Sequence, residues 1–123
     1  MSRVSTTTRR SVAARSGGRC ELCRSGRATE VHHRKPRGMG GTKKAASNAL
    51  SNLLHLCAAD HRGLIEMNRE VSLSMGWLVR QADDPARTPV RVWQGWVYLD
   101  DLGGVTPAPE AGRGRRGPSG YER

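Results

Sequence analysis

The chain has 123 residues and a mass of 13.4 kDa, which is enough for one compact domain and too little for two. It carries 21 Lys and Arg against 11 Asp and Glu, a formal net charge of +10, and its mean hydropathy is −0.64. With no Phe and an apolar fraction of 36%, the composition excludes a large hydrophobic core. Something besides apolar burial is therefore expected to stabilise the fold.

The positive charge is concentrated in the first third of the chain. Residues 1–44 contain 12 basic and 2 acidic residues, whereas residues 45–103 contain 5 basic and 7 acidic ones. An excess of this size over a short segment is typical of proteins that bind a polyanion. The charge distribution favours a partner such as DNA over a small acidic ligand.

Cysteine usage and hydropathy indicate the compartment. No apolar run approaches the roughly 20 residues of a membrane helix, and Met1–Arg10 lacks the apolar stretch of a secretory signal. The three cysteines cannot all pair within one chain, and Cys20 and Cys23 form a C-x-x-C motif. That motif favours a metal site or a redox pair over a structural disulfide, so we expect a cytoplasmic protein with no membrane partner.

The predicted elements of the first half are short. Residues 1–7 are expected to be a flexible basic N-terminus, and a helix capped by the threonines at 6–8 is expected to end at Ser16, before Gly17 and Gly18. A tight cysteine-containing turn, or knuckle, is predicted at 19–26 and a strand at 28–33. The glycine-rich basic segment 34–47 is predicted to be a loop, and the alternation at 53–56 predicts a second strand.

The second half is predicted to be a helix, a hairpin and a tail. The helix runs from residue 57 to about 70, weakened by Gly63, and a further helical turn ends at Gly76. A β-hairpin is predicted from arms at 90–93 and 96–99 joined by Gln94-Gly95. We therefore divide the chain into a core at 8–76, a hairpin extension packed on it at 77–102, and a disordered Gly/Pro/Arg tail at 103–123. The three tryptophans are expected to lie in the core.

The cysteines predict a structural zinc site. Cys20 and Cys23 lie before the two predicted strands and Cys57 directly after them, a spacing that brings three thiolates together. Asp60 occupies the position at which a cysteine would complete a second C-x-x-C motif. We expect Asp60 to be the fourth ligand; the alternative is that Asp60 only caps the helix and His61 or water completes the shell.

A second, catalytic metal site is predicted from histidines. His32 and His33 are adjacent on a predicted strand, so their rings point to opposite sides, one toward a metal and the other toward a water. His61 in the first helical turn can reach the same metal as His32. His33 is then the candidate general base for hydrolysis of a DNA phosphodiester, and Asn52 is expected to hold either the His33 ring or the backbone of the loop.

The basic loop between the two strands is expected to grip the phosphate backbone of DNA. The candidate phosphate contacts are Arg34, Lys35, Arg37, Lys43 and Lys44.

The motifs C-x-x-C, V-H-H-R-K-P-R-G-M-G-G and S-N-L-L-H-L-C, followed by His61, resemble those of HNH endonucleases. The chain is similar in particular to small stand-alone HNH proteins of bacteriophages that infect actinobacteria. The resemblance implies an α+β fold built on a ββα-metal finger with a zinc knuckle. It also implies metal-dependent cleavage that leaves 5′-phosphate ends, with His33 as the base, Asn52 as the motif asparagine and His61 as the last motif histidine and metal ligand. His32 takes a place where many members have a metal-binding Asp.

The resemblance further implies a role in phage genome processing or packaging in the infected host cell, with the terminase as a partner. The chain departs from the family pattern at Asp60, which stands for the fourth zinc cysteine, and at Ile65, where a second histidine is common. With His32 and His61 as its protein ligands, the catalytic ion is expected to be Mg²⁺ or Mn²⁺, bound weakly until DNA arrives. We expect a monomer or weak dimer. The alternative function is a non-catalytic, zinc-stabilised DNA-binding module.

Overall fold

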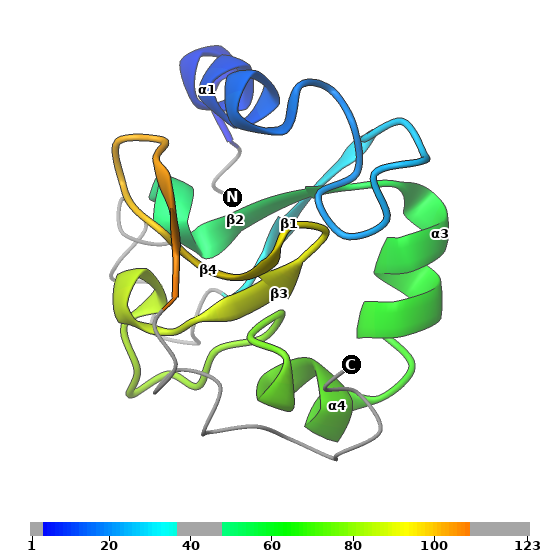
Figure 1. Ribbon diagram of the computed structural model, residues 1–123, viewed down its shortest axis with the longest axis vertical. Helices are drawn as coiled ribbons and strands as arrows, with labels where there is room; N and C mark the ends of the chain where they lie inside the picture. The colour runs from blue at the N-terminus through cyan, green and yellow to red at the C-terminus, as the bar shows by residue number, and fades with distance from the viewer. Residues whose placement is uncertain (1–3, 37–47, 109–123) are drawn as a thin grey trace.

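A computed structural model describes residues 4–36 and 48–108. Within these ranges the chain has an α+β fold in which the strands form a two-stranded and a three-stranded antiparallel sheet (Figure 1). The two-stranded sheet pairs β1 with β2, and the other sheet has the order β3-β4-β5. The elements are α1 (Thr6–Ser16), β1 (Glu30–His33), β2 (Leu53–Leu56), α3 (Ala58–Asp60), α4 (Arg69–Ser74), β3 (Val90–Val92), β4 (Gly95–Leu99) and β5 (Val105–Pro107), with short 3-10 turns at Leu50–Asn52 and Pro85–Arg87. None of the helices in the described part of the chain has the length and apolar character needed to cross a membrane.

Helix α1 has the boundaries that its capping residues predict. The Ser5 hydroxyl accepts the backbone N–H of Thr8, and Gly17, at φ +70°, ends the helix in the left-handed conformation. The expectation of a flexible segment at 1–7 is wrong for its described part. Val4 is buried against Val12 of α1 and Leu53 of β2, so apolar packing orders the chain before the helix begins.

The β1–β2 ribbon lies between α1 and the three-stranded sheet, as Figure 1 shows. Adjacent leucines of β2 point to opposite faces: Leu53 packs with the α1 side, and Leu54 packs with the β3–β4 side. Because His33 pairs with Leu53 and His32 with Leu54, the two histidines also lie on opposite faces of the ribbon. The predicted division of the His-His pair between two faces is therefore confirmed.

A buried ion pair joins α1 to the knuckle. Arg15 Nε donates to Glu21 Oε2 at 2.8 Å, and their side chains are only 2% and 8% exposed. The Arg15 guanidinium also donates to the carbonyl oxygens of Leu50 and Leu53, and the Glu21 carboxylate accepts the N–H of His55. This polar network is one of the stabilising features that the low apolar content leads us to expect.

The hairpin is present, but its turn lies one residue earlier than predicted. Val92 pairs with Gly95, so Trp93 and Gln94 form the turn. The predicted hairpin pairs Val92 with Val97, whereas in the structure Val97 pairs with Val90, a shift of two residues. Both registers place the same valines inward, so side-chain alternation cannot distinguish them. The Trp93 N–H donates to the Glu21 carbonyl at 2.9 Å, and the Arg24 guanidinium lies 4.4 Å from the Trp93 ring. Trp93 is consequently 48% exposed rather than in the core, whereas Trp77 is buried.

Two further predictions are corrected by the structure. The segment 103–123 was expected to be disordered, yet β5 within it pairs with β4, joined by a loop in which Asp100 accepts the N–H groups of Leu102 and Gly104. The rest of that segment, from residue 109, lies outside the described residues. The single helix predicted at 57–70 is instead α3 followed by a π-helical turn, η2 (His61–Ile65), and the separate helix α4, which Asn68 caps.

Candidate metal centres

The knuckle is a compact turn that presents two sulfur atoms. The Cys20 N–H donates to the Gly26 carbonyl and the Arg24 N–H to the Cys20 carbonyl, both at 2.9 Å. Arg24 adopts a left-handed conformation at φ +64°. A Cβ on Gly26 would lie 3.2 Å from Cys57 Cβ and 3.4 Å from its sulfur, so glycine permits the close approach of Cys57 to the knuckle.

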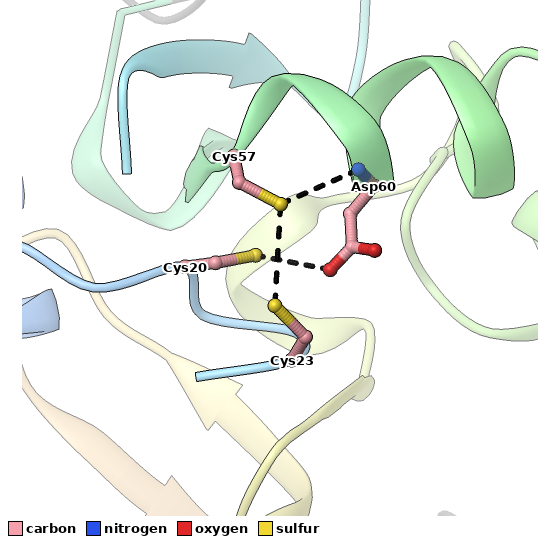
Figure 2. A group of neighbouring side chains, drawn as sticks. All are labelled: Cys20, Cys23, Cys57 and Asp60. Carbon is pink, nitrogen blue, oxygen red and sulfur yellow. Dashed lines mark hydrogen bonds between the residues drawn. The ribbon is translucent and has the colours of Figure 1, made fainter. Parts of the chain in front are cut away.

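Four side chains converge at this point, two from the knuckle and two from the start of the helix (Figure 2). The ligand atoms of Cys20, Cys23, Cys57 and Asp60 all lie within 4.8 Å of one another. Cys23 Sγ is 3.9 Å from Cys57 Sγ, and Cys20 Sγ is 3.2 Å from Asp60 Oδ2. Tetrahedral zinc, with Zn–S about 2.3 Å, needs sulfur atoms about 3.8 Å apart and sulfur–oxygen pairs slightly closer. The donor set therefore fits a tetrahedral metal such as zinc.

Burial determines the chemistry of the innermost sulfur. Cys20 is fully buried, and this burial raises the pKa of its thiol to about 12. A thiol becomes a ligand by losing its proton to a bound cation, so metal binding here releases protons and is favoured by rising pH. The predicted cluster of three cysteines and Asp60 is confirmed as a group that could hold one metal ion.

A second arrangement of ligand atoms lies between β1 and the π-helical turn. His32 Nδ1 is 3.2 Å from His61 Nε2. The other nitrogen of each ring has a hydrogen-bond acceptor: His32 Nε2–H donates to the Trp77 carbonyl at 2.8 Å, and His61 Nδ1–H donates to Glu30 Oε1 at 2.6 Å. The two remaining lone pairs therefore face each other, an arrangement that a cation between them stabilises.

The surroundings of His32 and His61 favour the ring states that can bind a cation. Burial lowers the pKa of His32 to about 4, so its ring is neutral at pH 7 and retains its lone pair. The hydrogen bond from His61 holds the pKa of Glu30 below its usual value, so this carboxylate is charged and fixes the tautomer of His61. The structure thus brings together the two histidines predicted to share a metal.

His33 and Asn52 contact different groups. His33 Nε2–H donates to Asn48 Oδ1 at 2.9 Å, so Asn52 does not hold the His33 ring through this nitrogen. Asn52 is buried and clamps the loop backbone instead: its Oδ1 accepts the Lys35 N–H at 2.7 Å, and its Nδ2 donates to the Lys35 carbonyl at 3.1 Å. Of the two predicted roles for Asn52, the structure supports orientation of the loop.

Arg34 is the clearest correction to the predicted phosphate contacts. Its side chain is fully buried, and its guanidinium donates to backbone carbonyls within the protein, so it cannot reach a phosphate. Lys35 Nζ donates to the Asp83 carbonyl at 2.6 Å. Arg37, Lys43 and Lys44 lie outside the described residues.

Sequence reasoning missed three partners of the histidines. Glu30 precedes His32 by two residues on the same strand and so shares its face, a signal that was available. Asn48, at the end of the basic loop, and the backbone carbonyl of Trp77 have no sequence signature.

Comparison of the chain with protein-family models, with curated proteins and with solved structures found no match. An assignment of function therefore depends on the chemistry of the residues described above.

Proposed function

We propose that this chain is a divalent-metal-dependent endonuclease of the ββα-metal, or HNH, type that hydrolyses DNA phosphodiester bonds. The observation that carries the proposal is the pair of ring nitrogens His32 Nδ1 and His61 Nε2, 3.2 Å apart, with each ring oriented by an acceptor on its other nitrogen. Two nitrogens at this separation can both lie about 2.1 Å from one ion, with an angle near 100° at the ion.

The order of elements supports the same proposal. β1 supplies His32, β2 follows as its antiparallel partner, and the helix that begins at Ala58 supplies His61 through its π-helical turn. Two strands and a helix in this order are the elements that the resemblance to HNH endonucleases implies. The knuckle cluster is the corresponding structural zinc site in the proposal.

In this proposal the residues around the histidine pair have three different roles in hydrolysis: metal binding, proton acceptance and restraint of the backbone. His32 and His61 would hold a divalent ion, which would supply positive charge near the DNA phosphate and the oxygen that leaves it. His33 donates from Nε2 to Asn48, which leaves Nδ1 as the proton acceptor for an attacking water. Asn52 fixes the backbone of Lys35, two residues beyond His33, and so restrains the end of the strand that carries the base.

The partner in this proposal is DNA, because residues 1–44 carry 12 basic against 2 acidic residues. The resemblance to phage proteins extends the proposal to phage genome processing, with a terminase as a candidate protein partner.

The test is cleavage of supercoiled plasmid by zinc-loaded protein in the presence of Mg²⁺ or Mn²⁺. We expect relaxed or linear product that disappears with EDTA and in the His33→Ala variant. His55→Gln is the matched control, because the His55 ring is bonded to Ser16 at 2.7 Å and takes part in neither the His32–His61 pair nor the His33–Asn48 contact, so its substitution should leave cleavage intact. Zinc content and circular dichroism establish that each variant is folded.

Folded wild-type protein that binds plasmid and linear DNA but never cleaves them would contradict the proposal. That result would favour a non-catalytic, zinc-stabilised DNA-binding module, which needs the cysteine cluster but not the histidine pair.

A further inference from the structure

Glu66 lies beside the histidine pair, immediately after the π-helical turn. Its Oε2 is 3.8 Å from His61 Nε2, the same nitrogen that faces His32. We infer that Glu66 is a third protein ligand to the divalent ion at His32 and His61. This inference rests on the proposed function, since it concerns the metal placed there.

The π-helical turn is what brings Glu66 to this position. In an α-helix the residue four positions after His61 lies over it, and here that residue is Ile65. The Glu66 N–H instead donates to the His61 carbonyl at 3.2 Å, a bond that spans five residues. The wider turn directs Ile65 into the core, where it is 4% exposed, and places the Glu66 carboxylate next to His61.

Both separations measured from His61 Nε2 fit a shared ion. Around an octahedral ion with ligands at about 2.1 Å, ligand atoms lie between about 3.0 Å apart when adjacent and about 4.2 Å when opposite. The 3.2 Å and 3.8 Å separations from His61 Nε2 both lie in this interval. Among the described residues only the cysteine–Asp60 group already holds three or more ligand atoms together. Glu66 therefore has to turn toward His32 to join the ion, and its side chain, 58% exposed, can do so without disturbing the core.

Glu30 and Glu66 have different roles at His61. Glu30 accepts the hydrogen bond from Nδ1, whereas Glu66 faces Nε2, the nitrogen that has the free lone pair. Glu30 is therefore a positioning residue for the ring. Two imidazole nitrogens and a carboxylate oxygen are ligands that suit Mn²⁺ and similar ions. With Glu66 as a ligand, the ion has three protein ligands although residue 65 is an isoleucine and not a histidine.

The inference is tested by Mn²⁺ titration of zinc-loaded protein without DNA, with free Mn²⁺ measured by electron paramagnetic resonance. We expect Glu66→Gln to weaken Mn²⁺ binding at least 10-fold. Glu70→Gln is the control, because it removes the same charge from a neighbouring exposed position and should change the affinity less than 2-fold. Glu66→His should retain binding of Ni²⁺, because an imidazole replaces the carboxylate as a ligand.

The outcomes separate the inference from the proposed function. Mn²⁺ binding that is lost in His61→Ala but unchanged in Glu66→Gln would overturn the inference and leave the metal site standing. Equal weakening of Ni²⁺ binding by Glu66→Gln and Glu66→His would also overturn it, because only the charge of Glu66 would then matter. Wild-type protein that binds no Mn²⁺, or binds it regardless of His61, would overturn the proposed site itself and the inference with it.

Discussion

Replacement of Arg34 by methionine should strongly destabilise the protein. The guanidinium is fully buried and donates to four backbone carbonyls at distances between 2.7 and 3.1 Å, those of Gly76, Ser51, Pro85 and Thr88. Burial lowers the pKa of Arg34 to about 9, which still leaves it charged at pH 7. Each hydrogen bond from a charged donor contributes about 1.5–3 kcal/mol, while the buried charge costs several kcal/mol.

The net change in the free energy of unfolding depends on the carbonyl groups that lose their hydrogen-bond donor when methionine replaces Arg34. The aliphatic part of the side chain is replaced, but four carbonyls lose their donor, two of them buried and two half-buried. An unsatisfied buried acceptor costs about 1–3 kcal/mol, so we expect the two buried carbonyls alone to lower the free energy of unfolding by about 2–6 kcal/mol. The free energy of unfolding is measured by urea denaturation, with the fluorescence of the buried Trp77 as a signal. Arg80→Met, at an exposed position, is the control and should cost less than about 0.5 kcal/mol.

A different result would restore the phosphate-contact hypothesis for Arg34. If Arg34→Met left the free energy of unfolding within about 1 kcal/mol of the wild type and weakened DNA binding, the guanidinium would have to leave the interior in solution. If Arg34→Met unfolded the protein while Arg80→Met did not, the buried clamp would be confirmed.

Two further predictions concern the metal centres and their support. Removal of zinc by a chelator should lower the melting temperature. Asp60→Cys should bind zinc more tightly than the wild type in competition with a chromophoric chelator, because a fourth thiolate replaces a carboxylate. Equal zinc affinity of the two proteins would place Asp60 outside the coordination shell. Asn52→Ala should cost about 2 kcal/mol in urea denaturation, because it leaves both backbone groups of Lys35 without their partner at the edge of the core. An Asn52→Ala variant with wild-type stability would contradict the clamp.

The sequence predicted those features that depend on local spacing. Cys20, Cys23 and Cys57 flank a two-stranded ribbon, and an antiparallel pair returns the chain to its start, so their convergence follows from the topology. The placement of His32 and His33 on opposite faces of the ribbon follows likewise from the alternation of side chains along a strand.

Features that depend on distant backbone atoms were not predictable. Arg34 lies in a basic run that is typical of an exposed loop, and its burial depends on carbonyls of residues 76–88, which carry no sequence signal for this contact. The observed hairpin register goes together with a tertiary hydrogen bond from the Trp93 backbone N–H to the Glu21 carbonyl, an acceptor that the local pattern does not reveal. In both cases the contacts involve backbone acceptors that are distant in the sequence, which a local pattern cannot predict.

The two candidate centres are joined by one short stretch of helix. Cys57 caps it, with its sulfur accepting the Asp60 N–H at 3.4 Å, and the His61 N–H donates to the Cys57 carbonyl at 3.0 Å. Asp60 and His61 are adjacent but belong to different centres, because successive helical residues point about 100° apart. A metal ion in the cysteine cluster would therefore fix the start of the helix against the knuckle and, through one peptide unit, the direction of the His61 ring. Such an ion would add to the hydrogen bonds to Glu30 and the Trp77 carbonyl in holding two imidazole nitrogens 3.2 Å apart in a chain with only 36% apolar residues.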